Sequence, residues 1–450
     1  MNLDKVRHVY FIGIGGIGMS ALARYFKSVG KNVAGYDRTK TPLTSELEDL
    51  GMAIHYMDKV SQIPEDYTNT EETLIVYTPA IPREHTEYQY FLRAGFRIYK
   101  RSEVLGLITK DTFCLAVAGT HGKTTTSCIL AHLLKECGVS FTAFLGGISE
   151  DFNSNFVYTG TEYSIVEADE FDRSFLQLFP HVSCITSMDA DHLDIYGDKK
   201  TLHDSFREFA ERIAPDGKVF VRKNLPLKGT TYGVADGSEY RIENLRLNEG
   251  AYLFDLITPK DTIKDVVFKK PGRHNLLNAL VAFAMAIQTG VSVEELARAL
   301  ETFKGVQRRF SYHVRSENFV FIDDYAHHPT EINAVYEAII EMHPGKKITA
   351  VFQPHLFSRT RDFADEFAIS LSKFDTVLLL DIYPAREKPM KGITSKWLLE
   401  KIRTKDRKLI KKSTLVKEIK QHNPEVLVTM GAGDIGLEVS KIKNELAYAN

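Results

Sequence analysis

Short apolar runs bounded by polar residues or glycine alternate along the chain with longer segments of helical hydrophobic spacing. At the start of the chain, this pattern predicts strands at residues 8–14, 31–36, 73–77 and 97–99. A helix is predicted at 19–29, ending at Gly30, and the glycine-rich residues 13–18 form the turn before it. Repeated strand–helix–strand units of this kind indicate a parallel sheet covered by helices.

The same alternation restarts twice further along the chain. The second series predicts strands at 113–118, 163–167 and 182–186, helices at 123–135, 275–289 and 293–302, and a polar, strand-rich stretch at 218–269. The third predicts strands at 319–323, 347–352, 376–380 and 426–430, with helices at 329–342 and 362–371. We therefore predict an α/β protein of three consecutive α/β domains at 1–106, 107–311 and 312–450. The first and last are expected to be Rossmann-like.

Composition narrows the class of protein. The 450 residues are 44% hydrophobic and 26% charged, as in ordinary globular proteins, and the formal net charge of −2 provides no basic field for nucleic acid or anionic lipid. Four cysteines without a C-x-x-C spacing fit a reducing cytosol. Glycines interrupt the apolar run at 9–19, which argues against a signal peptide, and no run approaches the roughly 20 apolar residues of a membrane span. We expect a cytoplasmic protein that does not insert into membranes.

The first glycine-rich turn has the G-x-G-x-x-G spacing between a predicted strand and helix. Its residues are Gly13, Gly15, Gly16, Ile17 and Gly18, and Asp37 follows the second strand. Such a loop lets the backbone approach a pyrophosphate, while the acidic residue can accept hydrogen bonds from ribose hydroxyls. A nicotinamide dinucleotide and a nucleotide-diphosphate sugar present the same two phosphates, so an oxidoreductase remains an alternative at this point.

A second glycine loop, GTHGKTTT at 119–126, also joins a predicted strand to a helix. It is a variant P-loop, because Val117 stands where the usual pattern has its first glycine. Lys123 can neutralise the β- and γ-phosphates, and the Thr124 hydroxyl can reach Mg²⁺. This loop predicts ATP binding, so the central domain at 107–311 is expected to be a P-loop ATP-binding domain.

Carboxylates follow two later strands of the same series, at residues 167–170 and 189–194. Parallel strands deliver their carboxyl ends to one edge of a sheet, which is also the edge that carries the P-loop. Grouped carboxylates would repel a triphosphate unless a divalent cation lay between them. Oxygen ligands suit magnesium, so the sequence predicts a magnesium–nucleotide site there.

In the third series, polar residues again gather after strands, at 323–331 and 353–361, with Arg308 and Arg309 just before. Pro329 and Glu331 suit a first helical turn, so the His327–His328 pair could serve as a helix cap. Two polar strand ends in one domain nevertheless indicate a substrate-binding wall.

Taken together, these motifs resemble those of the Mur ligases. The resemblance rests on GIGGIGMSA at 13–21, GTHGKTTT at 119–126, EADEFDRSF at 167–175, DADHLDIYG at 189–197, GRHNLLNA at 272–279, GVQRRF at 305–310, DDYAHHPTEI at 323–332 and FQPHLFSRT at 352–360. The first loop and DDYAHHPTEI are most similar to the alanine-adding member. The resemblance implies an ATP- and Mg²⁺-dependent ligase of peptidoglycan precursor synthesis that joins L-alanine to the lactyl carboxylate of UDP-N-acetylmuramate through an acyl phosphate.

The resemblance also implies residue roles. ATP would be bound by Gly119, Thr120, His121, Gly122, Lys123, Thr124, Thr125, His274, Asn278 and Arg309. The implied catalytic residues are Lys123, Glu167 and His192, and Thr124, Glu167 and His192 would serve the metal. The first glycine loop and Asp37 would hold the UDP-sugar, and Asp324, Tyr325, His327, His355 and Arg359 the amino acid. We expect a monomer or weak homodimer.

Two residues depart from the family pattern, and three alternatives remain. Ser187 stands where many members have asparagine, and Leu356 where arginine is common, which leaves Arg359 to grip the amino-acid carboxylate. A recycling ligase that adds a preformed peptide to the same nucleotide sugar is the nearest alternative. A nicotinamide-dependent oxidoreductase and an ATP-dependent interaction switch are the others.

Overall fold

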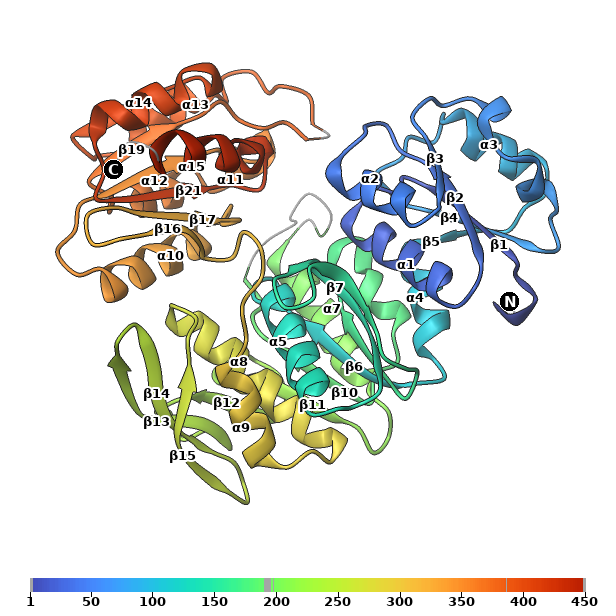
Figure 1. The fold of residues 1–450 in the computed structure, drawn as a ribbon, viewed down its shortest axis with the longest axis horizontal. Helices are drawn as coiled ribbons and strands as arrows, with labels where there is room; N and C mark the ends of the chain where they lie inside the picture. The colour runs from blue at the N-terminus through green and yellow to red at the C-terminus, as the bar shows by residue number, and fades with distance from the viewer. Residues whose placement is uncertain (1–2, 190–195, 197, 386, 448–450) are drawn as a thin grey trace. The chain divides into compact units, whose positions relative to one another are not determined.

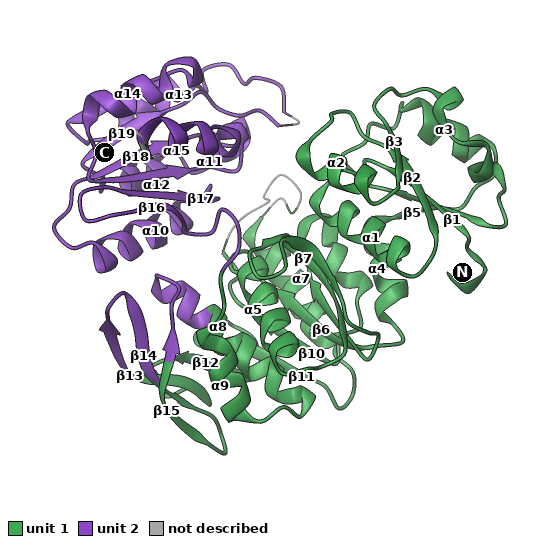
Figure 2. Ribbon diagram, in the orientation of Figure 1, with its two compact units in different colours: residues 1–244, 255–266, 278–304 green, residues 245–254, 267–277, 305–450 purple. Residues whose placement is uncertain are grey.

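The computed structural model describes residues 3–189, 196, 198–385 and 387–447, coloured along the chain in Figure 1. The chain forms two compact units, shown in Figure 2. The first comprises residues 1–244, 255–266 and 278–304, and the second comprises residues 245–254, 267–277 and 305–450. Each is built from strands and helices in alternation, as the α/β prediction requires.

The first sheet is fully parallel, with strand order β3-β2-β1-β4-β5. Its strands are β1 (His8–Ile12), β2 (Asn32–Tyr36), β3 (Ala53–His55), β4 (Thr73–Tyr77) and β5 (Ile98–Lys100). The helices around it are η1 (Leu3–Lys5), α1 (Ile17–Ser28), α2 (Pro42–Asp49), η2 (Val60–Gln62), η3 (Glu65–Thr68), α3 (Thr86–Arg93) and α4 (Arg101–Thr109). Val9 and Phe11 enter one core and Tyr10 and Ile12 the other, so β1 is apolar throughout because both its faces are covered.

The second sheet has ten strands in the order β15-β14-β13-β12-β11-β10-β6-β9-β7-β8. They are β6 (Phe113–Ala118), β7 (Phe141–Ser149), β8 (Ser154–Tyr158), β9 (Tyr163–Glu167), β10 (Val182–Ile185), β11 (Lys218–Arg222), β12 (Thr230–Val234), β13 (Tyr240–Asn248), β14 (Ala251–Ile257) and β15 (Thr262–Phe268). Its helices are α5 (Lys123–Glu136), η4 (Phe171–Gln177), α7 (Lys199–Glu211), α8 (Arg273–Ala286), η5 (Ile287–Thr289) and α9 (Val293–Glu301). Strands β10, β6, β9 and β7 run parallel, so their carboxyl ends share one edge.

The third sheet has the order β16-β17-β21-β18-β19-β20, and only β16 is antiparallel to its neighbour. Its strands are β16 (Ser311–Arg315), β17 (Val320–Asp324), β18 (Ile348–Phe352), β19 (Thr376–Leu379), β20 (Asp406–Leu409) and β21 (Val426–Met430). Its helices are α10 (Pro329–Met342), α11 (Phe357–Asp362), α12 (Ala364–Leu371), α13 (Ser395–Lys401), η6 (Lys412–Thr414), α14 (Leu415–His422), η7 (Asp434–Glu438) and α15 (Val439–Ala447).

Helix α1 connects the first two sheets within the first unit. Its aromatic residue Tyr25 packs against Phe144 of β7 and Phe156 of β8, with ring centroids 5.6 and 6.3 Å away. The buried Asn155 amide on β8 donates to the Ile17 carbonyl at 2.6 Å and to the Ser20 hydroxyl at 2.9 Å. The first turn of α1 is therefore fixed against the second sheet.

The predicted elements are largely confirmed, with differences at their ends. The predicted strand at 8–14 stops at Ile12, because Gly13 turns the chain with φ +90°. The predicted helix at 362–371 corresponds to α12, and the separate short helix α11 that precedes it was not predicted. Strands β3, β7, β8, β16 and β20 and helices α7, α13, α14 and α15 were not predicted. Short elements carry little periodic signal, but α7 and β7 are long enough to carry one and were overlooked.

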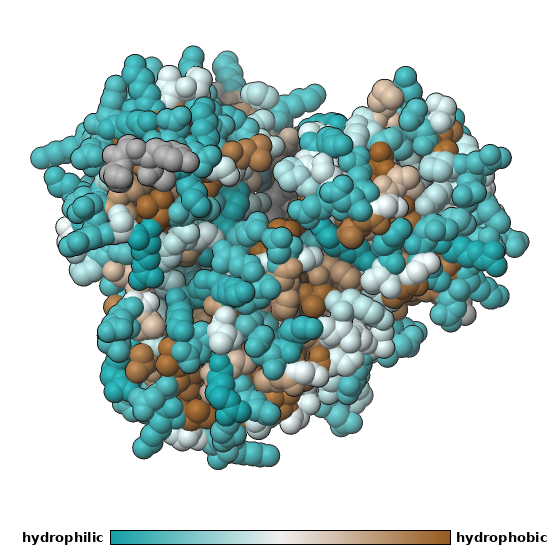
Figure 3. Space-filling model, in the orientation of Figure 1, coloured by the Kyte–Doolittle hydropathy of each residue, from teal (hydrophilic) through white to brown (hydrophobic). Residues whose placement is uncertain are grey.

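Among the described residues, no helix is long and apolar enough to span a membrane. The face drawn in Figure 3 is mainly hydrophilic, with apolar residues in smaller separate groups.

Candidate active site

The first glycine loop lies between β1 and α1, and its shape depends on missing side chains. The Gly13 and Ile14 amides both donate to the Tyr36 carbonyl of β2, at 2.8 and 3.0 Å. The Gly15 amide donates to the Asp37 carboxylate at 2.8 Å. A Cβ at Gly15 would lie 2.8 Å from that same carboxylate oxygen, so a larger residue would have to displace the Asp37 side chain. The predicted diphosphate loop and Asp37 are thus in contact.

A cavity of about 260 Å³ adjoins this loop. Its lining comprises Gly16, Ile17, Gly18, Met19, Ala21, Leu22, Thr78, Arg101, Leu105, Phe144, Leu145, Gly146, Glu167 and Asp169. The cavity brings the predicted UDP-sugar loop beside Glu167, the predicted metal and catalytic residue. Sequence reasoning missed one charged residue of this lining, Arg101, whereas Asp169 belongs to the carboxylate group predicted at 167–170.

Arg101 begins α4 and lies directly over the start of α1. A Cβ at Gly18 would be 2.9 Å from an Arg101 guanidinium nitrogen, and the guanidinium pairs with Asp169 at 3.7 Å. A cation beside a helix N-terminus adds to the positive potential offered to an anion. No local motif identifies this arginine, because 83 positions separate it from Gly18 in the sequence. The two residues meet only because α4 packs on α1.

The P-loop follows β6 and begins α5. Gly119 and Gly122 take φ values of +126° and +86°, and Gly122 caps the helix without a side chain. The Lys123 ammonium turns back to the Gly119 carbonyl at 2.6 Å and pairs with the buried Glu170 carboxylate at 2.7 Å. Burial opposes the lysine charge, but the carboxylates of Glu170, Asp169 and Glu167 outweigh it and raise the pKa of Lys123. Lys123 is therefore a cation held inside the loop.

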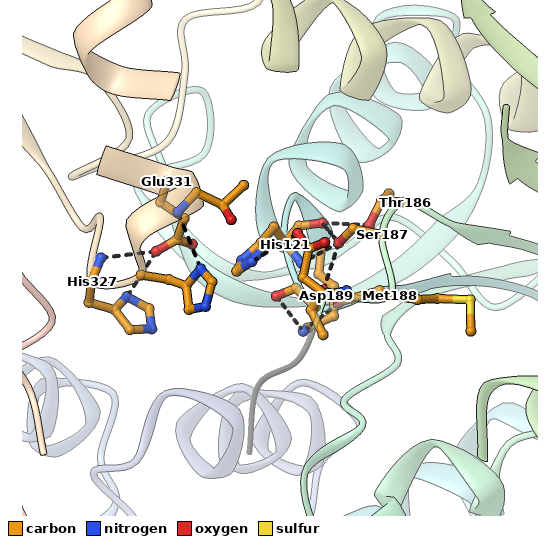
Figure 4. Close-up of polar contacts among 12 residues, drawn as sticks. His121, Thr186, Ser187, Met188, Asp189, His327 and Glu331 are labelled. Carbon is orange, nitrogen blue, oxygen red and sulfur yellow. Dashed lines mark hydrogen bonds and ion pairs between the residues drawn. The ribbon is translucent and has the colours of Figure 1, made fainter. Parts of the chain in front are cut away.

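Ser187, which departs from the family pattern, supports this loop from the end of β10 (Figure 4). Its hydroxyl accepts from the His121 amide at 2.8 Å and bonds the Thr120 hydroxyl at 2.8 Å. Asp189 donates its amide to the Thr120 hydroxyl, and its carboxylate lies 3.4 Å from the His121 ring. The serine hydroxyl thus orders the loop that the sequence assigned to ATP.

The predicted metal residues are only partly described. Glu167 ends β9 and pairs in register with Val117 of β6, and a Cβ at Gly146 would lie 2.0 Å from its carboxylate oxygen. Thr124 is buried in the first turn of α5. A carboxylate and a hydroxyl are oxygen donors of the kind magnesium prefers, so these residues fit the ion. His192 lies outside the described residues, and no group of three His, Cys, Asp or Glu converges on a metal within them.

The remaining predicted ATP residues lie in different places. A Cβ at Gly122 would be 2.5 Å from the Asn278 amide oxygen, so Asn278 lies against the P-loop. Thr125 is buried in α5. His274 and Arg309 belong to the second unit, where Arg309 lies 5.3 Å from the Tyr325 ring centroid. Their contact with ATP stays a prediction.

In the second unit, β17 ends in Asp323 and Asp324, whose carboxylates bond neighbouring parts of the chain. Burial raises the pKa of Asp324 to about 6, although Arg309 and the amides of Phe310 and Ala326, each 2.7 Å from the carboxylate, lower it. Asp323 pairs with Arg308 at 3.0 Å. Asp324 therefore shapes the turn that carries the predicted amino-acid residues.

Those residues form a chain of contacts at the ends of β17 and β18. The ring centroids of Tyr325 and His327 are 5.4 Å apart, and those of His327 and His355 are 6.1 Å apart. An Arg359 guanidinium nitrogen lies 3.4 Å from the His355 ring nitrogen. The two polar strand ends therefore lie close together, and their role as a substrate-binding wall stays a prediction.

The two neighbouring histidines of this segment have different roles. The His327 ring nitrogen Nδ1 bonds the Tyr325 carbonyl at 2.9 Å and lies 3.3 Å from Glu331 of α10 (Figure 4). His328 caps α10 by accepting from the Thr330 amide at 3.3 Å. The capping hypothesis is therefore confirmed for His328. The His327 ring instead lies near the rings of Tyr325 and His355.

Leu356, the second departure, precedes α11 with φ +69°, a conformation that leucine rarely adopts. Its side chain is buried and carries no hydrogen-bond donor. Arg359, three residues later and also buried, is the guanidinium closest in sequence to this position.

Comparison with known proteins gives matches along nearly the whole chain. Models of the Mur ligase family catalytic domain, the Mur ligase middle domain and the Mur ligase glutamate ligase domain match residues 8–112, 117–286 and 308–437. Proteins named UDP-N-acetylmuramate–L-alanine ligase from Flavobacterium psychrophilum and Christiangramia forsetii are each 58% identical, over 446 and 448 residues, covering 99% of this chain and of theirs.

A crystal structure of UDP-N-acetylmuramate–alanine ligase from Thermotoga maritima is similar in fold, with a TM-score of 0.84 and 27% identity. It covers 98% of this chain and 100% of that one. A murein peptide ligase from Psychrobacter arcticus, 24% identical with a TM-score of 0.70 and 98% coverage of both chains, shares the fold. Three domain models in the expected order and full-length relatives agree with the two glycine loops and the carboxylate edge, and this chain belongs to the Mur ligase family.

Proposed function

We propose that this chain uses ATP to join L-alanine to the lactyl carboxylate of UDP-N-acetylmuramate. The observation that carries the proposal is the cavity of the first unit, where Gly16 and Gly18 of the diphosphate loop open beside Glu167. A nucleotide sugar held by that loop would extend toward the carboxylate edge next to the P-loop. Proteins of this name at 58% identity over 99% of both chains support the choice of substrates.

The reaction has two steps. An oxygen of the lactyl carboxylate attacks the γ-phosphorus, the bond to the β-phosphate oxygen breaks, and ADP leaves. The alanine amine then attacks the carbonyl carbon of the acyl phosphate, the carbon–oxygen bond to phosphate breaks, and the amine loses a proton. Activation is needed because a carboxylate does not react with an amine in water at a useful rate.

Residues of the first unit would position the nucleotide sugar and the phosphates. Gly13, Gly15, Gly16, Ile17, Gly18 and Asp37 would hold UDP, and the Arg101 guanidinium would face its diphosphate. The positive charge of Lys123 would stabilise the transferring phosphoryl group, whose negative charge is spread over three oxygens. Thr124, Glu167 and His192 would hold Mg²⁺, which supplies charge neutralisation between the carboxylate and the phosphate.

Residues of the second unit would bind the amino acid. Arg359 is buried next to His355 and would pair with the alanine carboxylate. His327, whose Nδ1 bonds the Tyr325 carbonyl, would lie beside the amine of the amino acid. Domain closure is needed if the nucleotide sugar, ATP and alanine are bound by three separate domains, as the division at 106/107 and 311/312 proposes. We further propose a cytoplasmic monomer or weak homodimer.

One assay separates the candidate functions. The purified chain is mixed with MgATP and combinations of UDP-N-acetylmuramate and amino acids, and ADP is measured. Release of ADP that needs both the nucleotide sugar and alanine is expected. Turnover with a tripeptide but not alanine would indicate the recycling ligase, and ADP release without the nucleotide sugar an ATP-driven switch.

A further inference from the structure

The ammonium of Lys123 contacts hydrogen-bond acceptors of the P-loop backbone and of the Glu170 side chain. It donates to the Gly119 carbonyl at 2.6 Å and lies 2.7 and 3.0 Å from the two carboxylate oxygens of Glu170, with the Thr120 carbonyl at 3.4 Å. An ammonium has three hydrogens, so these contacts account for its donor capacity. A phosphate oxygen can bond Lys123 only by displacing one of them.

Glu170 is the partner that a phosphate must displace. Its carboxylate carries the same sign of charge as the phosphate, and two anions on one buried ammonium repel each other strongly. The Gly119 and Thr120 carbonyls are neutral and belong to the loop that wraps the phosphates, so they can remain in place.

The backbone of Glu170 is fixed at the start of η4. Its carbonyl accepts from the Tyr196 hydroxyl at 2.5 Å and from the Arg173 amide at 2.9 Å. The Glu170 side chain is 1% exposed and that of Lys123 is 12% exposed. Removing the charge of Glu170 takes away the carboxylate that pairs directly with the Lys123 ammonium at 2.7 Å, which destabilises the protein without nucleotide.

We propose that Glu170 is a positioning residue that holds Lys123 against Gly119 while the nucleotide site is empty and gives the lysine to phosphate when ATP binds. This inference rests on the proposed function, in which Lys123 contacts the ATP phosphates. Part of the binding free energy of ATP is then used to break the ion pair. The pair keeps the lysine in the loop, at the expense of affinity.

The test measures MgATP binding to the full chain by titration calorimetry, without other substrates, and thermal unfolding of the unliganded protein. In Glu170→Gln the dissociation constant for MgATP should fall at least about fivefold, while the unfolding midpoint falls. These opposite signs separate the proposal from a structural role, because a variant that only damages the loop would bind MgATP more weakly. Glu170→Asp, which shortens the reach of the carboxylate, should shift the dissociation constant in the same direction by a smaller factor.

Asp172→Asn is the matched control, since it removes the same charge from the same turn but pairs with Lys100, at 2.7 Å. Its dissociation constant should stay within about twofold of the wild type. An unchanged or weaker affinity in the folded Glu170 variants, or equal tightening in Asp172→Asn, would overturn the proposal. A Lys123→Ala variant that binds MgATP as well as the wild type would instead contradict the role of Lys123 in the proposed function.

Discussion

The two glycine loops of the first unit share a strand–loop–helix topology but differ in what begins the helix. The first has Gly16 in an extended conformation followed by Ile17, which is 39% exposed. The second has Gly122 in the left-handed region followed by Lys123, which turns into the loop. Both present helix-terminal N–H groups to an anion. The cation beside the first loop, Arg101, comes from another helix, whereas Lys123 is the first residue of the helix that the second loop begins. The first therefore suits a diphosphate that is only held, and the second a phosphoryl group that is transferred.

Two buried glutamates of the first unit, Glu170 and Glu87, differ in whether a lysine side chain neutralises them. Glu170 pairs with Lys123. Glu87, in the first sheet's domain, instead accepts from the Tyr10 hydroxyl at 2.7 Å and the Lys59 amide at 3.2 Å. A buried carboxyl without a close cationic partner favours its protonated form. The comparison thus makes predictions for both loops and for both acids.

The largest effect is expected for Lys123→Ala. Loss of the cation should lower kcat by about 10²–10³-fold, because the charge that develops on the transferring phosphoryl group loses its preorganised partner. Binding of UDP-N-acetylmuramate, measured by calorimetry, should change by less than about twofold, since the first loop holds the diphosphate. Equal loss of nucleotide-sugar binding would contradict the division between the loops.

The second prediction concerns pH and Glu87. Burial raises the pKa of Glu87 to about 7, opposed by the hydrogen bonds from Tyr10 and Lys59, whereas the unfolded carboxyl titrates near 4.5. The native state therefore binds more protons between these pH values, so this group contributes stability at low pH that is lost as pH rises from about 4.5 to about 7. The contribution of Glu87 to the free energy of unfolding is at most about 3 kcal/mol, which changes the unfolding equilibrium by about a hundredfold.

Glu87→Gln isolates this effect from its titratable neighbours, His55 at 3.4 Å and Asp58. The free energy of unfolding is measured by urea titration at pH 5 and pH 8. The variant should be more stable relative to the wild type at pH 8 than at pH 5. Burial lowers the pKa of His55 and His85, which acts in the opposite direction in both proteins, so the variant is compared with the wild type at each pH. A difference that does not change with pH would contradict the raised pKa.

Gly15→Ala should weaken nucleotide-sugar binding by about tenfold, because the new Cβ would lie 2.8 Å from Asp37 and 2.7 Å from Thr44. Affinity for MgATP should be unchanged within about twofold. Gly16→Ala is a matched variant with a smaller expected loss, since its Cβ would meet Met19 at an ordinary 3.6 Å. If both variants lost nucleotide-sugar affinity equally in calorimetry, crowding at Gly15 would not be the cause.

The smallest effect is expected for Ser187→Ala. Loss of the hydrogen bond to the His121 amide, worth about 1 kcal/mol, should raise the KM for ATP about fivefold. The KM for the nucleotide sugar should stay the same, because Ser187 contacts the second loop. Ser187→Asn, the residue typical of the family at this position, should restore the KM for ATP if its amide oxygen accepts the same bond.

The sequence by itself determined the parallel strands, the two glycine loops and the family. Buried parallel strands are continuous apolar runs, and left-handed turns such as those at Gly13 and Gly122 require glycine, so these features are written locally. It also indicated a substrate-binding wall after β17 and β18, and the rings of His327 and His355 at these strand ends lie 6.1 Å apart.

Only the tertiary structure decided which distant side chains meet these loops. Arg101 reaches Gly18 because α4 packs beside α1, and Asn155 fixes the start of α1 from β8. The ion pair of Lys123 with Glu170 and the support from Ser187 likewise join strand ends that are far apart in the chain. Such contacts depend on how helices and strands pack together, and packing has no period in the sequence from which these partners could be read.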